Sequence, residues 1–268
     1  MSEIFQWLKK AGHQRDELLL EDESPAPSPP AFRPEFNLEL ADRRIKIVLD
    51  PLSAPGEQFR FLRTTLGRLQ RQGSLKTLLV TSSVPGEGKT FTACSLAGIL
   101  AQEPEKRVML IDADLRNPRV AEKLGMEVSP TLAGLADVLK GNKEIDDVLV
   151  RSEVLGLAFV YAGRVPTNPS ELLASDNLEA AIHRAAEIAD WVVIDTPPVL
   201  AFADATRMAT LCDGVLLVVQ ANSTPAKLVQ KALQTVGRER VAGVVLNRVR
   251  HHPGSRYYYK RYSKKGQD

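Results

Sequence analysis

Cysteine is nearly absent from this 268-residue chain, which contains only Cys94 and Cys212. The two lie far apart and have no further ligand residues at metal-binding spacing, so neither a disulfide framework nor a zinc site is expected. No apolar run approaches the ~18 residues that a membrane-spanning helix requires, because stretches such as Gly214 to Val219 have the length of a strand. The N-terminus also lacks the basic-then-apolar layout of a secretion signal. These absences favour a protein of the reducing cytoplasm.

Charge is distributed unevenly, although the net charge of the whole chain is only +2. Residues 1–40 contain four Lys/Arg and eight Asp/Glu, a local net charge of −4. Residues 248–268 contain seven Lys/Arg and one Asp, a local net charge of +6. With 44% hydrophobic and 25% charged residues, the chain as a whole has the composition of a globular protein with one sizeable core. The two ends are therefore expected to differ in partner or purpose.

Proline predicts a domain boundary near residue 40. Five prolines between positions 25 and 34 follow the acidic run 21–23, a composition typical of a linker. We therefore divide the chain into a flexible N-terminal segment with its linker (1–39), a folded domain (40–250) and a basic tail (251–268). Ahead of the linker, Ile4, Phe5, Leu8 and Ala11 have the spacing of a short amphipathic helix, which is compatible with a docking helix or a frayed terminus.

The hydrophobic pattern predicts alternating helices and strands. Phe59, Leu62, Leu66 and Leu69 recur at steps of three and four, which indicates an amphipathic helix over residues 57–72. Short apolar runs predict strands at 77–80, 107–111, 157–160, 191–194, 214–219 and 241–246. Near-continuous apolar strands divided by helices imply an α/β fold, a doubly wound and mostly parallel sheet with helices on both faces. Ligands of such sheets bind at the carboxyl ends of the strands.

A glycine-containing loop lies between the first predicted core strand and a helical stretch. It reads Ser83-Val84-Pro85-Gly86-Glu87-Gly88-Lys89-Thr90. Gly86 and Gly88 allow backbone N–H groups to wrap phosphates, Lys89 is suited to reach the outer phosphates, and the Thr90 hydroxyl is suited to coordinate Mg²⁺. Serine occupies the first position of the usual G-x-x-x-x-G-K-T pattern, so a structural turn is the alternative. The order of strand, loop and helix disfavours that alternative.

Carboxylates follow two further predicted strands. Asp112, Asp114 and Arg116 come after the apolar run 108–111, and Asp195 comes after 191–194. Because Asp112 and Asp114 are two residues apart at a strand end, they are expected to point to one side, towards the site. One carboxylate can hold Mg²⁺ or its waters while another accepts a proton from an attacking hydroxyl. A single Asp after a strand is more often a turn or a helix cap, but three of them beside a phosphate loop predict a catalytic site.

Together these motifs resemble the bacterial tyrosine kinases, the BY-kinase family that accompanies polysaccharide export. The resemblance extends from about Leu40 to the C-terminus. Members of the family carry Pro-Gly-x-Gly-Lys-Ser/Thr, an Asp-x-Asp-x-Arg strand end and an apolar Walker B segment ending in Asp, and all three occur here. Relatives that partition DNA or position division sites carry an extra lysine five residues before the P-loop lysine, where this chain has Val84. The resemblance implies a P-loop fold of the deviant-Walker type, with ATP and Mg²⁺ as cofactors.

The resemblance also implies roles for individual residues. The implied catalytic residues are Lys89, Asp112, Asp114 and Asp195, and the implied metal ligands are Thr90, Asp112 and Asp195. The implied nucleotide-binding residues are Pro85, Gly86, Glu87, Gly88, Lys89, Thr90, Phe91, Arg116 and Asn247. Whether Asp112 or Asp114 is the base stays open. The segment 163–173 is similar to a family segment too, and we interpret it as structural, a turn followed by a capped helix start.

Two further patterns are similar to the kinase family. Glu57, Arg60 and Arg63 form the Glu-x-x-Arg-x-x-Arg pattern that joins subunits in a ring, and we expect them opposite the apolar helix face, available to a neighbour. A solvated face without a partner is the alternative. Tyr257, Tyr258, Tyr259 and Tyr262 in the basic tail resemble the tyrosine cluster that such kinases phosphorylate. An RNA- or membrane-binding patch is the alternative for the tail.

The resemblance thus implies a Mg-ATP-dependent protein-tyrosine autokinase that phosphorylates C-terminal tyrosines in trans and regulates polysaccharide synthesis or export. It implies a ring-type homo-oligomer, a membrane co-polymerase or activator made as a separate chain, a cognate tyrosine phosphatase and no nucleic-acid partner. The expected location is the cytoplasm, with recruitment to the inner face of the cell membrane through that partner. The alternatives are a partitioning or positioning ATPase of the same fold, and a non-catalytic scaffold that uses ATP to assemble.

Overall fold

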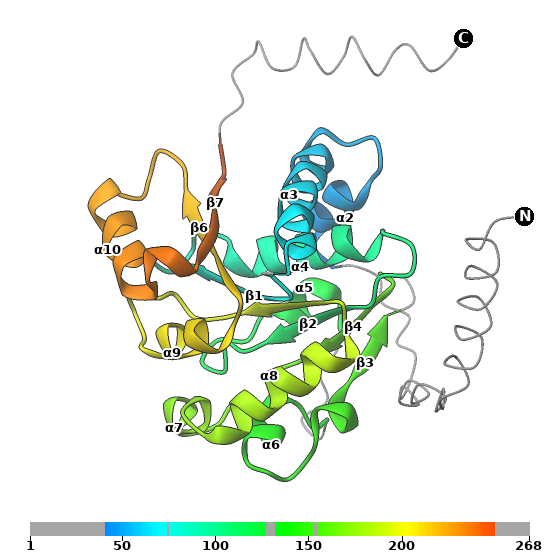
Figure 1. Ribbon diagram of the computed structural model, residues 1–268, viewed down its shortest axis with the longest axis vertical. Coiled ribbons are helices and arrows are strands. Elements are labelled where there is room, and N and C mark those ends of the chain that lie inside the picture. The colour runs from blue at the N-terminus through cyan, green and yellow to red at the C-terminus, as the bar shows by residue number, and fades with distance from the viewer. Residues whose placement is uncertain (1–40, 74, 127–131, 153–154, 250–268) are drawn as a thin grey trace, which may run out of the picture. The chain divides into compact units, whose positions relative to one another are not determined.

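The computed structural model describes residues 41–249, apart from 74, 127–131 and 153–154. Seven strands in this range form one sheet with the order β3-β4-β2-β5-β1-β6-β7 (Figure 1). They are β1 Thr77–Ser82, β2 Val108–Asp112, β3 Val150–Ser152, β4 Leu157–Val160, β5 Trp191–Asp195, β6 Gly214–Gln220 and β7 Val241–Asn247. All pairings are parallel except that of β3 with β4. The predicted fold class and six predicted strands are confirmed; β3, with three residues, is too short to show a pattern.

Helices cover both faces of the sheet (Figure 1). On one face lie α2 Arg43–Leu49, α3 Ala54–Arg71, α4 Lys89–Ala101 and α5 Val120–Leu124. On the other lie α6 Leu135–Leu139, α7 Pro169–Leu173, α8 Asp176–Ile188, α9 Asp204–Leu211 and α10 Ala226–Val236, with the 3₁₀ turns η1 Ile145–Val148 and η2 Arg238–Arg240. Each face has its own apolar core, as expected for a sheet buried on both sides. Within residues 41–249, leaving aside the short gaps, no helix combines the length and hydrophobicity needed to cross a bilayer.

The helix α3 confirms the predicted amphipathic helix. Ser53 caps its N-terminus by accepting a hydrogen bond from the N–H of Gly56 at 3.0 Å. Leu66 is fully buried, and the other three residues of the predicted stripe pack against the same core. Beneath α3, α4 is buried along almost its whole length, because it lies between α2 and α3 on one side and the sheet on the other.

The prediction that Glu57, Arg60 and Arg63 lie opposite the apolar face is wrong for Arg63. At about 100° per residue, Arg63 is only about 40° from Phe59 around the helix, so it faces α4. Its guanidinium donates to the carbonyl of Ile99, in the last turn of α4, at 3.0 Å. Arg60 pairs with Glu57 at 2.8 Å and also donates to a carbonyl in the turn before α3. Both arginines therefore bond to carbonyls of their own chain.

Asp42, the N-cap of α2, is expected to stabilise the domain in a pH-dependent way. Its carboxylate pairs with Arg44 at 2.6 Å and with Lys123 of α5 at 3.1 Å, and these bonds hold its pKa well below the usual range. A depressed carboxyl pKa contributes stability that is present above the unfolded pKa of ~3.9 and is lost as the pH falls. Asp42→Asn should keep the cap but lower the free energy of unfolding by about 1 kcal/mol at pH 7.

Urea unfolding at pH 7 and near pH 3 tests this prediction. The difference between the wild type and Asp42→Asn should shrink at the lower pH. Asp50→Asn, at the other end of α2, is the matched control and should have a smaller effect. A difference for Asp42→Asn that is independent of pH would contradict the ion-pair explanation.

Candidate active site

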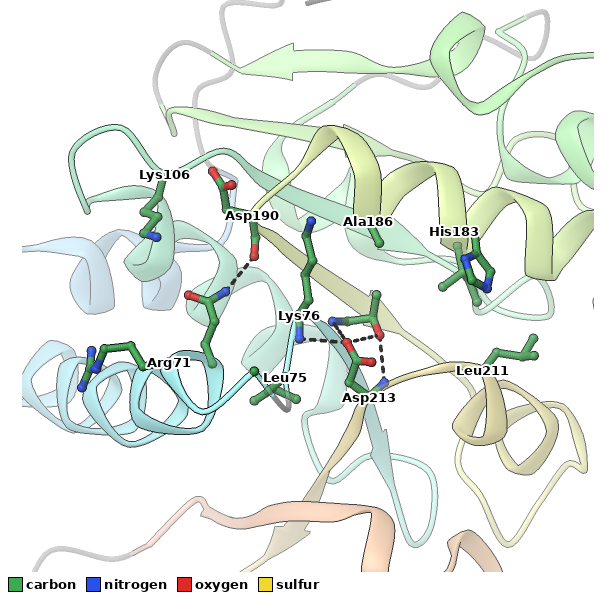
Figure 2. Close-up of a pocket in the computed structure, with 13 residues that line it drawn as sticks. Arg71, Leu75, Lys76, Lys106, His183, Ala186, Asp190, Leu211 and Asp213 are labelled. Carbon is green, nitrogen blue, oxygen red and sulfur yellow. Dashed lines mark hydrogen bonds between the residues drawn. The ribbon is translucent and has the colours of Figure 1, made fainter. Parts of the chain in front are cut away.

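A pocket of about 580 Å³ opens at the edge of the sheet where the strands begin (Figure 2). Its wall includes Lys76 and Thr77 at the start of β1, and Asp213 just before β6. The Asp213 carboxylate accepts hydrogen bonds from the N–H groups of Lys76 and Thr77 at 2.8 and 2.7 Å, which ties the two strand starts together. The predicted site residues lie at the opposite edge, where the strands end and where ligands of parallel sheets bind.

The P-loop connects the end of β1 at Ser82 to the start of α4 at Lys89. Gly88 is the N-cap of α4 and has a φ of 99°, in the left-handed region that favours glycine. A Cβ on Gly88 would also collide with the side-chain amide of Asn247 at the end of β7. Pro85 and Gly86 are exposed at the rim of the loop. The loop thus leads into the N-terminus of a helix, whose free N–H groups and dipole favour an anion.

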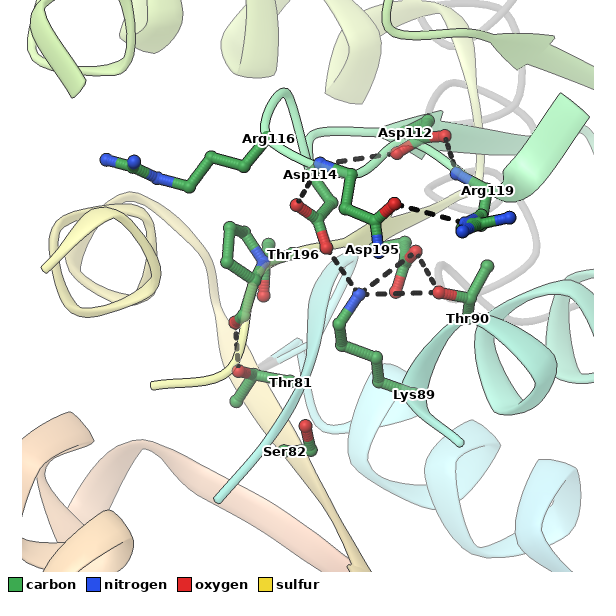
Figure 3. A network of polar contacts seen from close by, with 12 residues as sticks. Thr81, Ser82, Lys89, Thr90, Asp112, Asp114, Arg116, Arg119, Asp195 and Thr196 are labelled. Carbon is green, nitrogen blue, oxygen red and sulfur yellow. Dashed lines mark hydrogen bonds and ion pairs between the residues drawn. The ribbon is translucent and has the colours of Figure 1, made fainter. Parts of the chain in front are cut away.

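The register of the sheet brings the predicted catalytic residues together. Asp112 and Asp195 are direct neighbours at the ends of β2 and β5. The Lys89 ammonium lies 2.6 Å from the Asp114 carboxylate and 3.8 Å from that of Asp195 (Figure 3). The Thr90 hydroxyl donates to Asp195 at 2.7 Å. One lysine and three carboxylates therefore meet at the foot of the P-loop.

The pKa values at this site reflect burial and crowding of like charges. Burial raises the pKa of Asp195 to about 6, although Lys89 and the Thr90 hydroxyl act in the opposite direction. Burial also raises the pKa of Asp112, to about 8, and the nearby Asp195 adds to this effect. Burial alone would lower the pKa of Lys89, but Asp195 and Asp114 outweigh it and raise that pKa. The ammonium therefore stays charged at neutral pH and is available to phosphate oxygens.

The donor set around Asp195 fits a magnesium ion that arrives with phosphates. One Asp195 oxygen accepts from Thr90, while the other is buried and has no hydrogen-bond partner in the described part of the chain. Across residues 41–249 and outside the gaps, no three His, Cys, Asp or Glu side chains are grouped so that they could hold a metal by themselves. Mg²⁺ usually keeps several waters and binds through one or two carboxylates plus phosphate oxygens. Thr90 and Asp195 could supply the protein oxygens.

Asp112 and Asp114 have different surroundings, although only one residue separates them. The Asp112 carboxylate accepts hydrogen bonds from the N–H groups of Asp114, Arg119 and Val120 at 3.2, 3.1 and 3.0 Å. It thereby joins the end of β2 to the start of α5. Asp114 instead directs one carboxylate oxygen at Lys89, at 2.6 Å. Asp114 therefore lies on the side of the phosphate-binding lysine, and Asp112 holds the loop that carries it.

Arg116 points away from Lys89 (Figure 3). Its guanidinium pairs with the buried carboxylate of Asp204 at 2.8 Å and lies 4.1 Å from the centre of the Phe202 ring. It also donates to the Ser170 hydroxyl, which itself donates to Asp204 at 2.8 Å. No sequence pattern indicated Ser170 and Asp204 as partners of Arg116. Each lies in the first turn of a short helix, where a polar residue is usually interpreted as a helix cap.

Phe91 and Asn247 use their side chains for contacts within the chain. The Phe91 ring meets Phe59 edge to face at 6.2 Å, and the Arg44 guanidinium lies 5.3 Å from its centre. The Asn247 amide donates to the carbonyl of Glu87 at 2.7 Å. Nucleotide binding by Phe91, Arg116 and Asn247 therefore stays a prediction. The predicted phosphorylation sites Tyr257, Tyr258, Tyr259 and Tyr262, like residues 1–39, lie outside the described residues.

The fold and this site define a P-loop nucleotide-binding protein, and comparisons with known proteins agree. Residues 78–266 match the CobQ/CobB/MinD/ParA nucleotide binding domain. The chain is 33% identical to Tyrosine-protein kinase YwqD of Bacillus subtilis over 219 residues, which cover 81% of this chain and 91% of that protein. It is 34% identical to Tyrosine-protein kinase CpsD of Streptococcus agalactiae over 214 residues, 79% of this chain and 90% of that protein.

A solved structure shows the same relationship in three dimensions. The kinase domain of the Escherichia coli tyrosine kinase ETK superimposes with a TM-score of 0.72 at 31% identity, covering 78% of this chain and 81% of that one. The chain belongs to the bacterial tyrosine kinase family, within the CobQ/CobB/MinD/ParA nucleotide-binding class. The family resemblance of the sequence motifs is thereby confirmed.

Proposed function

We propose that this chain is a Mg-ATP-dependent tyrosine autokinase that transfers the γ-phosphoryl group of ATP to tyrosines in the C-terminal tail of a neighbouring copy. The observation that carries the proposal is the contact of Lys89 with Asp114 and Asp195 at the foot of the P-loop. The Lys89 ammonium, suited to bind phosphate, and the Asp114 carboxylate, suited to accept the proton of an attacking hydroxyl, lie 2.6 Å apart. Bound Mg²⁺ would neutralise phosphate charge beside Thr90 and Asp195.

Asp114, rather than Asp112, is the better candidate for the residue that orients and deprotonates the phenol. Asp112 is committed to three backbone N–H groups, and burial together with the nearby Asp195 raises its pKa. A phenol titrates near pH ~10 and a carboxylate near ~4, so the proton transfer follows charge development in a loose transition state. Positioning by Lys89 and Asp114 then contributes more than basicity.

Incubation of the full chain with Mg-ATP, followed by mass spectrometry of its C-terminal peptides, tests the proposed function. Phosphate on Tyr257, Tyr258, Tyr259 or Tyr262 is the expected result. A partitioning or positioning ATPase would hydrolyse ATP and leave the tyrosines unmodified, and a scaffold would bind ATP without turnover. Val84, at the place of the extra lysine of the partitioning relatives, speaks against the first of these alternatives.

Transfer between copies can be tested by mixing two complementary variants. One carries Lys89→Met with an intact tail, and the other is active but has all four tail tyrosines changed to Phe. Phosphotyrosine on the Lys89→Met copy is expected only in the mixture. If each active molecule modifies only itself, the mixture will show none.

We further propose that the chain self-associates through α3, and that the exposed side chain of Phe61 is part of the contact. Phe61 is 74% exposed, although it is large and apolar, and lies on the same helix as Glu57. Phe61→Ser should therefore lower the oligomer mass measured by light scattering without changing the unfolding temperature. Changing Glu57, Arg60 and Arg63 together to Ala is a less specific test, because both arginines brace their own subunit.

The matched control is Val165→Ser, which replaces an exposed apolar residue elsewhere on the domain. It should leave the oligomer mass unchanged. An identical mass for the wild type and Phe61→Ser would remove this face of α3 from the interface. Regulation of polysaccharide export through a separate membrane partner, and reversal by a tyrosine phosphatase, remain proposals that rest on the family resemblance.

A further inference from the structure

A buried carboxylate in the phosphate-binding loop is physically unexpected, because its charge would repel phosphate. Glu87 lies between the two loop glycines and is only 1% exposed. A buried carboxylate is costly unless hydrogen bonds compensate it. Both oxygens of Glu87 accept hydrogen bonds, and none of these three bonds involves the residues that surround Lys89.

The two carboxylate oxygens of Glu87 serve two different segments. Oε2 accepts a hydrogen bond from the N–H of Val84 at 2.9 Å, which closes the loop on itself. Oε1 accepts from the N–H of Gln220, at the end of β6, at 3.1 Å, and from the Thr224 hydroxyl just before α10. One side chain therefore shapes the loop and attaches it to the neighbouring strand end.

The main chain of Glu87 is fixed as well. Its carbonyl accepts from the Asn247 amide at 2.7 Å. In a trans peptide the C=O and the following N–H point in opposite directions, so this bond turns the N–H of Gly88 away from Asn247. That orientation suits an N–H group that must meet a phosphate oxygen at the helix N-terminus.

Further hydrogen bonds join the end of β6 to Asn247 and Arg248, the residues that precede the C-terminal tail. The N–H of Ala221 donates to the Asn247 carbonyl at 2.9 Å, and the Arg248 guanidinium donates to the Gln220 side chain at 3.0 Å. The P-loop and the ends of β6 and β7 therefore form one hydrogen-bonded unit, with Glu87 at its centre.

We propose that Glu87 is a positioning residue that presets the P-loop for the phosphates of ATP by holding it to Thr224 and the end of β6. The inference rests on the proposed function only in taking ATP as the ligand. Glutamine cannot replace the carboxylate, because its amide NH₂ would face an N–H donor on one side or the other. A loop that is already held in its bound conformation lowers the conformational cost of binding ATP. Loss of these hydrogen bonds should therefore weaken nucleotide affinity more than it lowers turnover at saturating ATP.

The test is titration of the full chain with a fluorescent ATP analogue and Mg²⁺, together with autophosphorylation at saturating ATP. Glu87→Gln should weaken binding about tenfold, and Thr224→Val, which removes one hydroxyl, about fivefold, the range expected for one or two lost hydrogen bonds. The turnover number of Thr224→Val at saturating ATP should stay within about twofold of the wild type. Thr224→Val keeps the test decisive if Glu87→Gln does not fold.

Thr235→Val is the matched control, since its hydroxyl bonds to the Lys231 carbonyl in the exposed part of α10. It should bind like the wild type. Wild-type affinity in both Glu87→Gln and Thr224→Val, or an equal loss in Thr235→Val, would overturn the proposal. So would a lowered unfolding temperature with unchanged affinity, which indicates a purely structural role. A wild type that binds the analogue but forms no phosphotyrosine would contradict the proposed function and leave the role of Glu87 standing.

Discussion

Replacing Lys89 with methionine should reduce autophosphorylation by about 10³-fold while the domain stays folded. Removing one preorganised donor to developing charge commonly costs this much. The side chain of Lys89 is 13% exposed and its ammonium contacts two carboxylates, so its charge acts in a site that excludes most water. The measurement is phosphotyrosine formation at saturating Mg-ATP, with circular dichroism to verify the fold.

Lys76→Met is the matched control for this experiment. Lys76 lines the pocket at the opposite edge of the sheet, far from the P-loop in the topology, so its loss should leave autophosphorylation unchanged. Undiminished phosphotyrosine in Lys89→Met would refute the assignment of Lys89. Lys89→Met should also be less stable at pH 8 than at pH 5, because buried Asp195, whose pKa is already raised to about 6, loses the counter-charge of Lys89 and must ionise as the pH rises.

Asp114→Asn and Asp112→Asn should both lose most activity, but for different reasons. Asp114→Asn removes the carboxylate that faces Lys89, so activity should fall about 10²- to 10³-fold with little change in unfolding temperature. Asp112→Asn weakens the bonds to three N–H groups that join β2 to α5, so activity and unfolding temperature should fall together.

Comparing kinetics with thermal unfolding for both variants separates these roles. Normal turnover in both would remove the carboxylate pair from the mechanism. If Asp112→Asn is inactive at wild-type stability while Asp114→Asn is active, the proposed roles are reversed. Asp146→Asn, which alters an exposed ion pair with Arg184, is a control that should change neither quantity.

Much of the fold follows from patterns of neighbouring residues. Apolar runs located six strands, and steps of three and four located α3, because sheet and helix burial each impose a fixed period. Arg63 shows where that reasoning fell short. It lies only about 40° from Phe59 around α3, on the side of the helix that faces α4. Its hydrogen bond to the last turn of α4 depends on how the two helices pack. The antiparallel β3 and the short helices α2 and α5 carry too few residues for a period to appear.

The sequence by itself determined the chemistry of the site, because the P-loop spacing and the strand-end carboxylates are local patterns, each within a few residues of chain. Only the tertiary structure decided which of those groups contact one another. Asp112 and Asp195 became neighbours through the register of β2 and β5, and Asp114, not Asp112, met Lys89. Glu87 bonds to Thr224, 137 positions away, and Arg116 to Asp204, 88 positions away. Such contacts depend on the packing of distant elements, which no local pattern encodes.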